Sequence, residues 1–385
     1  MFNEEQPQNS TRARDLGVPF DGTPGPLNAI TDVPGLEVGL VTLTSDAPTT
    51  TRTGVTAILP RGRDRAGTPC AAGIAVLNGN GELTGRSWIE ESGQLQAPIA
   101  ITNSHAVGAV HRGVDAWMAD HHAESAAAWM LPVVGETWDG YLNSINADTV
   151  HPEHAALALD LARSGPVAEG NVGGGTGMNC YGFKGGTGTA SRVVRSGDHA
   201  WTVGVLLQAN FGSRKELRVQ GRPLGRDSQA PNPMETDNWF AADLGAATNA
   251  SARAIPGAGS VIVIVATDAP LLPDQCRALA RRVPLGLART GTTGSHFSGD
   301  IFLAFSTANA EGLSSRMGGG TVVTESVEHV AWGSIDPFFE AVVEATEEAV
   351  VNALVGARDT VGRNGHASFA LPHQEVRAAF GDPAI

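Results

Sequence analysis

Three short runs of mainly apolar residues constrain the fold of this chain more than any other feature. They span residues 201–209, 260–266 and 301–306, and the second reads Val-Ile-Val-Ile-Val-Ala after its first serine. A strand with one solvated face alternates apolar and polar side chains, whereas a continuous apolar run is typical of a strand buried on both faces. We therefore expect these runs to be buried strands.

Segments with helical periodicity are interleaved with the strands. They span residues 106–118, 152–163, 273–282 and 337–357. The last is the clearest, because Asp336 is placed to cap it, Pro337 occupies its first turn and Gly356 lies at its end. This mixture of elements predicts an α/β or α+β layered sandwich.

The charge balance narrows the classes of function. The 385 residues include 40 acidic and 26 basic ones, for a formal net charge of −14. Nucleic acids require a basic surface, so this balance argues against a nucleic-acid partner.

The first 14 residues do not resemble a signal peptide, and no apolar run reaches the ~18–20 residues that a membrane span needs. We expect a cytoplasmic protein with no membrane partner.

The sequence contains no pattern that predicts a metal or a cofactor. Cys70, Cys180 and Cys276 are widely spaced and form no ligand pair. The glycine-dense segment 170–188 lacks the G-x-x-x-x-G-K-S/T pattern of a phosphate-binding loop and has no acidic residue placed for a ribose. Its glycines are better interpreted as allowing the backbone to approach a substrate or another chain closely.

The dipeptide Gly259-Ser260 is a position at which the chain could cut itself. Small residues lead directly into the apolar run there, and glycine leaves its carbonyl open to attack by the Ser260 hydroxyl. Hydrolysis of the resulting ester would leave an α-amine on Ser260, whose ordinary pKa of ~7.7–8.0 suits a general base. Taken alone, the dipeptide also fits an ordinary turn before a core strand.

Two further groups of polar residues adjoin the apolar runs. Ser298 and Asp300 are two residues apart before the third run, so in an extended chain they face the same side and could relay a proton. Asn210 directly follows the first run, where its amide could donate to a developing oxyanion. Taken alone, each group also fits the side-chain hydrogen bonding of an ordinary turn.

These features fall within a series of segments that resembles one protein family. The family is the self-processing aminopeptidases, which include L-aminopeptidase/D-Ala-esterase/amidase (DmpA) and the β-peptidyl aminopeptidases (BapA). The resemblance extends from about residue 14 to residue 380. The matching segments are 29–35 (AITDVPG), 102–105 (TNSH), 136–143 (ETWDGYLN), 173–177, 184–192 (KGGTGTASR), 208–212 (QANFG), 259–272 (GSVIVIVATDAPLL) and 289–309.

The resemblance implies a fold and a processing event. Members of the family fold as a four-layer αββα sandwich of the DOM type, which resembles the N-terminal-nucleophile hydrolases. The chain would be a single catalytic domain, 1–385, cut into a larger subunit, 1–259, and a smaller subunit, 260–385. The two pieces would stay associated and assemble into a tetramer of αβ heterodimers.

The resemblance also implies roles for individual residues. The catalytic set comprises the nucleophile, a hydroxyl–carboxylate relay and an oxyanion donor: Ser260, Ser298, Asp300 and Asn210. Glu136 matches a carboxylate that holds the free ammonium of the substrate. This contact is suited to the task because charge-assisted hydrogen bonds are strong. Trp138 stands where some relatives carry Tyr. Asp300 stands where some carry Glu.

The sequence therefore predicts a serine aminopeptidase that removes the first residue from short peptides, amides or esters. That residue could be a β-amino acid, a small L-amino acid or D-Ala. One alternative is an amidase of the same fold for non-peptide amides such as nylon oligomers, although those relatives use Thr as nucleophile. The other is an unprocessed, inactive scaffold or binding homologue.

Overall fold

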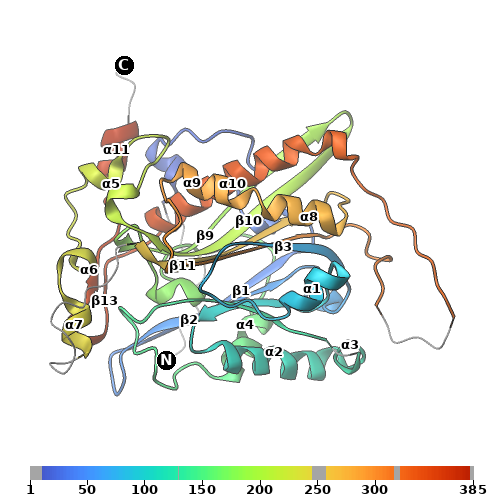
Figure 1. Ribbon diagram of the computed structural model, residues 1–385, viewed down its shortest axis with the longest axis horizontal. Coiled ribbons are helices and arrows are strands. Elements are labelled where there is room, and N and C mark those ends of the chain that lie inside the picture. The colour runs from blue at the N-terminus through green and yellow to red at the C-terminus, as the bar shows by residue number, and fades with distance from the viewer. Residues whose placement is uncertain (1–10, 129, 245–256, 316–320, 382–385) are drawn as a thin grey trace.

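A computed structural model of the chain describes residues 11–128, 130–244, 257–315 and 321–381. Its core is a pair of β-sheets stacked face to face (Figure 1). The first sheet contains, in spatial order, β1 (Glu37–Ser45), β2 (Thr51–Leu59), β5 (Ile99–Asn103) and β6 (Val133–Thr137). The second contains β4 (Gln94–Leu95), β3 (Cys70–Gly79), β12 (Gly299–Ser306), β11 (Gly257–Thr267), β10 (His199–Gly212) and β9 (Gly186–Ser196).

Helices cover the outer face of each sheet. The first sheet is covered by α2 (Val107–His121) and α4 (Pro152–Asp160). The second is covered by α8 (Pro273–Ala280), α9 (Val283–Arg289) and α10 (Asp336–Val355). Three buried apolar clusters fill the spaces between these four layers. The expected αββα sandwich is therefore confirmed.

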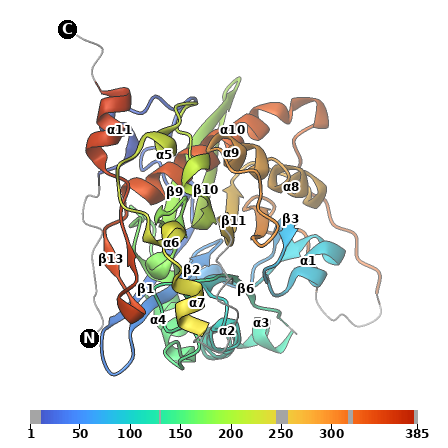
Figure 2. The same cartoon turned by 60° about the vertical axis from the view of Figure 1, so that its left-hand side comes forward.

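The remaining elements are short. The helices among them are α1 (Arg86–Ser92), α3 (Ala123–Ala127), α5 (Leu224–Asp227), α6 (Pro233–Thr236), α7 (Trp239–Leu244) and α11 (His373–Phe380). Two small hairpins pair β7 (Asn179–Cys180) with β8 (Phe183–Lys184), and β13 (Thr360–Val361) with β14 (Ala367–Ser368). The α6–α7 segment lies beside β13 at one end of the sandwich (Figure 2). No helix in the described part of the chain is long and apolar enough to cross a membrane.

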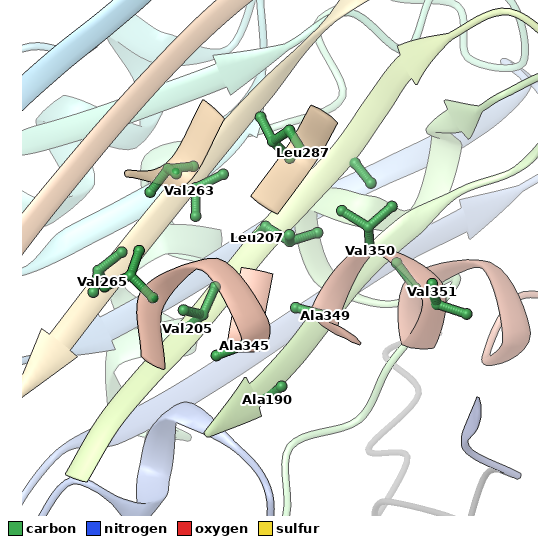
Figure 3. Close-up of a cluster of buried hydrophobic side chains, with 14 of the residues drawn as sticks. Ala190, Val205, Leu207, Val263, Val265, Leu287, Ala345, Ala349, Val350 and Val351 are labelled. Atoms are coloured by element: carbon green, nitrogen blue, oxygen red, sulfur yellow. The ribbon is translucent and has the colours of Figure 1, made fainter. Parts of the chain in front are cut away.

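Strand β11 explains why residues 260–266 are almost wholly apolar. Val263 and Val265 face the cluster beneath α10, which Figure 3 shows together with Leu207 of β10. The alternate residues, including Ile262 and Ile264, face the cluster between the two sheets. Because both faces of β11 are covered, neither set of positions accepts a polar side chain. The prediction of a buried strand is confirmed, as it is for β10 and β12.

Helix α10 carries a buried acidic residue on its inner face. Arg14 donates two hydrogen bonds to the Glu348 carboxylate, at 2.7 and 2.8 Å, and Arg192 donates a third at 2.8 Å. These guanidinium groups hold the pKa of Glu348 below its ordinary value although burial opposes them. The predicted cap needs a correction, because Asp336 is the first helical residue and Ile335 occupies the cap position without a side-chain hydrogen bond.

The glycine-dense segment lies inside the molecule. Residues Gly173–Gly177 form a buried 3-10 turn between the sheets. A Cβ on Gly174 would lie 2.1 Å from Gln208 Oε1, and one on Gly175 would lie 2.3 Å from the Thr187 nitrogen. The glycines are therefore required because the backbone packs closely against other parts of the same chain.

Candidate active site

Ser260 lies within the central strand of the second sheet. Its backbone is opposite Asn210 of β10 on one side and opposite Gly299 of β12 on the other. The residue is 2% exposed. Its Oγ accepts a hydrogen bond of 3.2 Å from the backbone N–H of Trp138, which directly follows β6 of the other sheet. The predicted nucleophile therefore lies where the two sheets meet.

The backbone before Ser260 has no room for a side chain. A Cβ on Gly259 would lie 1.8 Å from the carbonyl oxygen of Asn210. The β10–β11 register also shifts between Asn210 and Gly212, opposite this point, and Gly257 has a positive φ of 84°. The Gly259–Ser260 bond is thus inside β11, beside an irregularity in the ladder, where only glycine fits at position 259.

The Asn210 side chain has a fixed orientation. Its Oδ1 accepts the backbone N–H of Asn179 at 2.9 Å, and its Nδ2 donates to the carbonyl oxygen of Trp138 at 2.8 Å. The residue is 4% exposed. Because the amide oxygen is already bound to an N–H group, the NH₂ end is the one that faces Trp138. This is the orientation that an oxyanion donor requires.

Ser298 and Asp300 form a hydrogen-bonded pair beside Ser260. Ser298 Oγ donates to Asp300 Oδ1 at 2.5 Å, and Asn78 Nδ2 donates to Asp300 Oδ2 at 2.8 Å. Burial raises the pKa of Asp300, and the hydrogen bonds from Ser298 and Asn78 oppose that rise. Gly299, between the two, is the residue paired with Ser260. No hydrogen bond joins the pair to Ser260 within the described residues.

Glu136 presents a buried carboxylate near the same point. Its Oε1 accepts the backbone N–H of Glu82 at 2.9 Å, and its Oε2 accepts the Ser104 hydroxyl. Burial raises the pKa of Glu136, while these hydrogen bonds lower it. Among the described residues no Lys, Arg or His forms an ion pair with it. An anionic Glu136 can therefore accept a cation from outside the chain.

A cavity of about 410 Å³ is lined in part by Trp138, the residue whose backbone N–H contacts Ser260. Aromatic and small side chains form much of its wall, together with the ion pair of Asp243 and Arg363. The lining residues are His105, Trp138, Gly140, Ser144, Ile145, Asn146, Ala147, Trp239, Phe240, Asp243 and Arg363. Trp138 thus contributes its backbone to the nucleophile and its side chain to the cavity.

Lys184 is a buried residue to which the sequence analysis gave no role. Its ammonium group donates to the carbonyl oxygens of Met178, Gly185 and Gly175, at 2.7, 3.0 and 3.3 Å. Met178 precedes Asn179, whose N–H holds the Asn210 amide. Lys184 therefore fixes the segment that orients the Asn210 amide. One signal was available, since Lys184 is one of only two lysines in the chain.

Asp139 was also missed, and it lies directly after Trp138. Asn143 Nδ2 donates to its Oδ1 at 3.0 Å. Burial raises the pKa of Asp139, and the charge of Lys184 opposes the rise. Lys184 thus supports the Asn210 amide indirectly, through Met178 and Asn179, while Asp139 is a buried carboxyl next in sequence to the residue whose N–H contacts Ser260.

The side chains of the site are those of acyl-transfer chemistry. The hydroxyls of Ser260 and Ser298, the Asn210 amide, the Trp138 N–H and two carboxyl groups lie where the two sheets meet. No group of three or more His, Cys, Asp or Glu residues in the described ranges is arranged to hold a metal ion.

Comparison with solved structures places this fold in a known class. The chain superimposes on a β-aminopeptidase from Burkholderia sp. with a TM-score of 0.86 and 44% identity, covering 97% of this chain and 100% of the other. It also matches L-aminopeptidase D-Ala-esterase/amidase from Ochrobactrum anthropi, with a TM-score of 0.84 and 43% identity over 95% and 97% of the two chains. The latter is described as a prototype for the serine aminopeptidases and a variant of the Ntn hydrolase fold. The fold and site therefore define a serine aminopeptidase of the Ntn hydrolase type.

Sequence comparison gives the family. The model of peptidase family S58 matches residues 28–368. A β-peptidyl aminopeptidase BapA from Sphingosinicella microcystinivorans is 52% identical, over 95% of this chain and 91% of the relative. A second, from Sphingosinicella xenopeptidilytica, is 43% identical over 95% and 90%. The chain belongs to peptidase family S58.

Proposed function

We propose that the chain cuts itself between Gly259 and Ser260 and then uses Ser260 to remove the first residue of short peptides, amides and esters. The observation that carries this proposal is the placement of Ser260 between two donors. The Trp138 N–H contacts its Oγ, and Asn210 lies directly opposite it in the ladder. Family membership supports the same chemistry.

The cut would begin with attack of Ser260 Oγ on the carbonyl carbon of Gly259. The amide C–N bond breaks, an ester forms, and the Ser260 nitrogen gains a proton to become a free α-amine. Water then hydrolyses the ester, releasing the Gly259 carboxylate and restoring the hydroxyl. The products are residues 1–259 and 260–385, and the absence of a side chain at Gly259 leaves the carbonyl accessible.

Peptide hydrolysis would use the same Ser260 hydroxyl as nucleophile. Glu136 holds the substrate ammonium, and Ser260 Oγ attacks the first carbonyl. Asn210 Nδ2 and the Trp138 N–H stabilise the oxyanion, a contribution of about 2.7–4 kcal/mol for one such donor. The Ser260 α-amine or the Ser298–Asp300 pair takes the hydroxyl proton and returns it to the leaving amine. Water then releases the acyl group.

The proposed substrates carry a β-amino acid, a small L-amino acid or D-Ala at the free amino terminus. The relatives named β-peptidyl aminopeptidases and L-aminopeptidase D-Ala-esterase/amidase support this range. We further propose that the protein assembles into a tetramer of αβ heterodimers, as the family resemblance implies, and that it acts in the cytoplasm.

Intact mass spectrometry of the wild-type protein and a Ser260→Ala variant tests the proposal. The wild type is expected to give two species, of 259 and 126 residues (385 − 259 = 126), and to hydrolyse α- and β-aminoacyl p-nitroanilides. Ser260→Ala should give one full-length, inactive chain. Ser334→Ala, on an exposed 3-10 turn, is the matched control. A Ser260→Ala chain that still splits would overturn the assignment.

A further inference from the structure

Strand β3 carries one extra residue where it passes Asp300. The β3–β12 ladder pairs Ile301 with Val76. Asp300, the preceding residue of β12, is paired with Asn78 instead of Leu77, which is 47% exposed. Residues opposite each other in an antiparallel pair point to the same face of the sheet. This β-bulge therefore brings the Asn78 side chain against Asp300, as bulges beside active sites commonly re-aim a side chain.

The Asn78 side chain is oriented by two acceptors. Its Nδ2 donates to Asp300 Oδ2 at 2.8 Å and to the carbonyl oxygen of Ser295 at 3.1 Å. A carbonyl oxygen can only accept a hydrogen bond, so the NH₂ end of the amide faces these two groups. A donor in this place stabilises the ionised form of the carboxyl group. Burial raises the pKa of Asp300, and the hydrogen bonds from Ser298 and Asn78 oppose that rise.

The two carboxylate oxygens of Asp300 have different partners. Oδ1 accepts the Ser298 hydroxyl at 2.5 Å, and Oδ2 accepts the Asn78 amide. Asp300 is 3% exposed, and no Lys, Arg or His in the described ranges forms an ion pair with it. A carboxyl group turns readily about its bond to the β-carbon, because the energy profile of this torsion is broad. The Asn78 hydrogen bond opposes that rotation and leaves Oδ1 facing Ser298.

We propose that Asn78 is a positioning residue, which holds Asp300 so that its Oδ1 stays available to the Ser298 proton. The inference rests on the proposed function, with the Ser298–Asp300 pair as the proton acceptor. When the Ser260 hydroxyl attacks, its proton passes to Ser298 Oγ, and the Ser298 proton passes to Asp300 Oδ1. Both transfers reverse when the leaving amine is protonated, so the pair ends unchanged. Asn78 forms no hydrogen bond with Ser260 among the described residues, and its effect is therefore exerted through Asp300.

Asn80 provides a matched control for the test. Its Nδ2 donates to the carbonyl oxygen of Phe297 at 3.0 Å, so it anchors the same 290–298 segment that Asn78 contacts at Ser295. It forms no hydrogen bond with Asp300 in the part of the chain that the structure describes. Asn78→Ala should lower kcat for β-alanyl p-nitroanilide by about tenfold or more with KM unchanged, since positioned proton transfer contributes about 10²–10⁴-fold. Asn80→Ala should keep the wild-type kcat.

A double-mutant cycle separates positioning of Asp300 from support of the fold. Asn78→Ala should lower kcat no further in an Asp300→Ala background, whereas independent effects would multiply. Asn78→Asp is a second variant in case Asn78→Ala fails to fold. It keeps the shape of the side chain but replaces the NH₂ donor with an oxygen, so kcat should fall as well. Intact mass spectrometry records the extent of the cut, which replaces kcat as the readout for a variant that stays uncut.

The outcomes separate this assignment from the proposed function. Wild-type kcat in the Asn78 variants, an equal loss in Asn80→Ala, a change in KM alone or multiplied losses in the double variant would each overturn the role of Asn78. Wild-type kcat in Asp300→Ala would also overturn it, but would leave the Ser260 α-amine as the base and the aminopeptidase function intact. Where Asp300→Ala is too slow to measure, the contrast between the Asn78 and Asn80 variants decides. A wild type that hydrolyses no aminoacyl p-nitroanilide would refute the proposed function and this role together.

Discussion

Ser260 and Asn210 are direct partners across the antiparallel β10–β11 pair. The position of Ser260, the proposed nucleophile, relative to the Asn210 amide is therefore set by the register of two buried strands, which are rigid compared with loops. The Asn210 amide is then oriented by the Asn179 N–H at 2.9 Å. Such preorganisation is what makes an oxyanion donor effective in the transition state.

Replacing Asn210 with Ala should therefore lower kcat by about 10²–10³ with little change in KM, because the donor acts mainly in the transition state. Steady-state kinetics on an aminoacyl p-nitroanilide measures this. Asn171→Ala is the control, because the Asn171 side chain bonds Arg358 and Thr360 and no residue of the site. A change of KM alone would instead assign Asn210 to substrate binding.

Glu136 should set the acid limb of the pH profile. Burial raises its pKa above the ordinary value of about 4.3, and only the ionised form can hold an ammonium group. As the pH falls through this raised pKa, kcat/KM should decline at a higher pH than an ordinary Glu would give. Glu136→Gln should raise KM for amino-terminal substrates at pH values above this pKa, should approach the wild type below it, and should remove this limb.

The same substitution should not lower stability. A carboxyl whose folded-state pKa is raised costs stability once it ionises, so a neutral Gln removes that cost above the unfolded-state pKa. Denaturant unfolding of Glu136→Gln at pH 7 should give a midpoint equal to or higher than that of the wild type. A clear fall in the midpoint would show that the charge itself supports the fold.

Lys184→Met should destabilise the protein and slow catalysis together. The substitution leaves three buried carbonyl oxygens without their donor, and each such loss costs about 1–3 kcal/mol before relaxation. It also releases the segment that orients Asn210. Lys215→Met, at the exposed second lysine, is the control. Urea unfolding and kcat are the measurements, and a stable variant with unchanged kcat would contradict this account.

Glu348→Ala should be strongly destabilising without a direct effect on the site. It removes the 2.8 Å carboxylate partner of the buried Arg192, which keeps Glu344 at 3.3 Å, and both hydrogen bonds of the partly exposed Arg14. Breaking a buried ion pair by removing one partner commonly costs about 3–5 kcal/mol. The folded-state pKa of Glu348 is lowered, so its contribution is complete above the ordinary pKa of about 4.3 and is lost as the pH falls through the folded-state value. Denaturant unfolding of the wild type and of Glu348→Ala at pH 7 and below pH 4 measures this loss of stability. Glu340→Ala, at an exposed residue of the same helix, is the control.

Features that depend on local periodicity could be predicted from the sequence. Ser298 and Asp300 do meet on one side of the chain, because alternate residues of an extended segment share a face. The buried strands were predictable since a strand covered on both faces has no position for polar side chains. Proposed roles for the site residues came from the family resemblance.

Contacts that depend on how distant segments of the chain pack together could not be predicted from local periodicity. The Trp138 N–H that contacts Ser260 is a backbone group, and every residue except proline has one. The three carbonyl acceptors of Lys184 are likewise invisible in the sequence, because they are created by the path of a buried glycine-rich turn. The correction at Asp336 has a similar origin, since Ile335 already has helical backbone angles and takes the cap position.

The strand order of the second sheet has a consequence for the proposed cut. β12 and the part of β11 from Ser260 onward belong to residues 260–385, yet their neighbours on both sides, β10 and β3, belong to residues 1–259. After a cut before Ser260, β11 and β12 of the shorter piece would still be hydrogen-bonded to β10 and β3 of the longer piece. Release of the shorter piece would require breaking both sets of inter-strand hydrogen bonds. It would expose the unpaired edges of β10 and β3, and such edges favour aggregation. The pieces are therefore expected to behave as one cooperative folding unit, and a separately synthesised 260–385 chain should not fold alone.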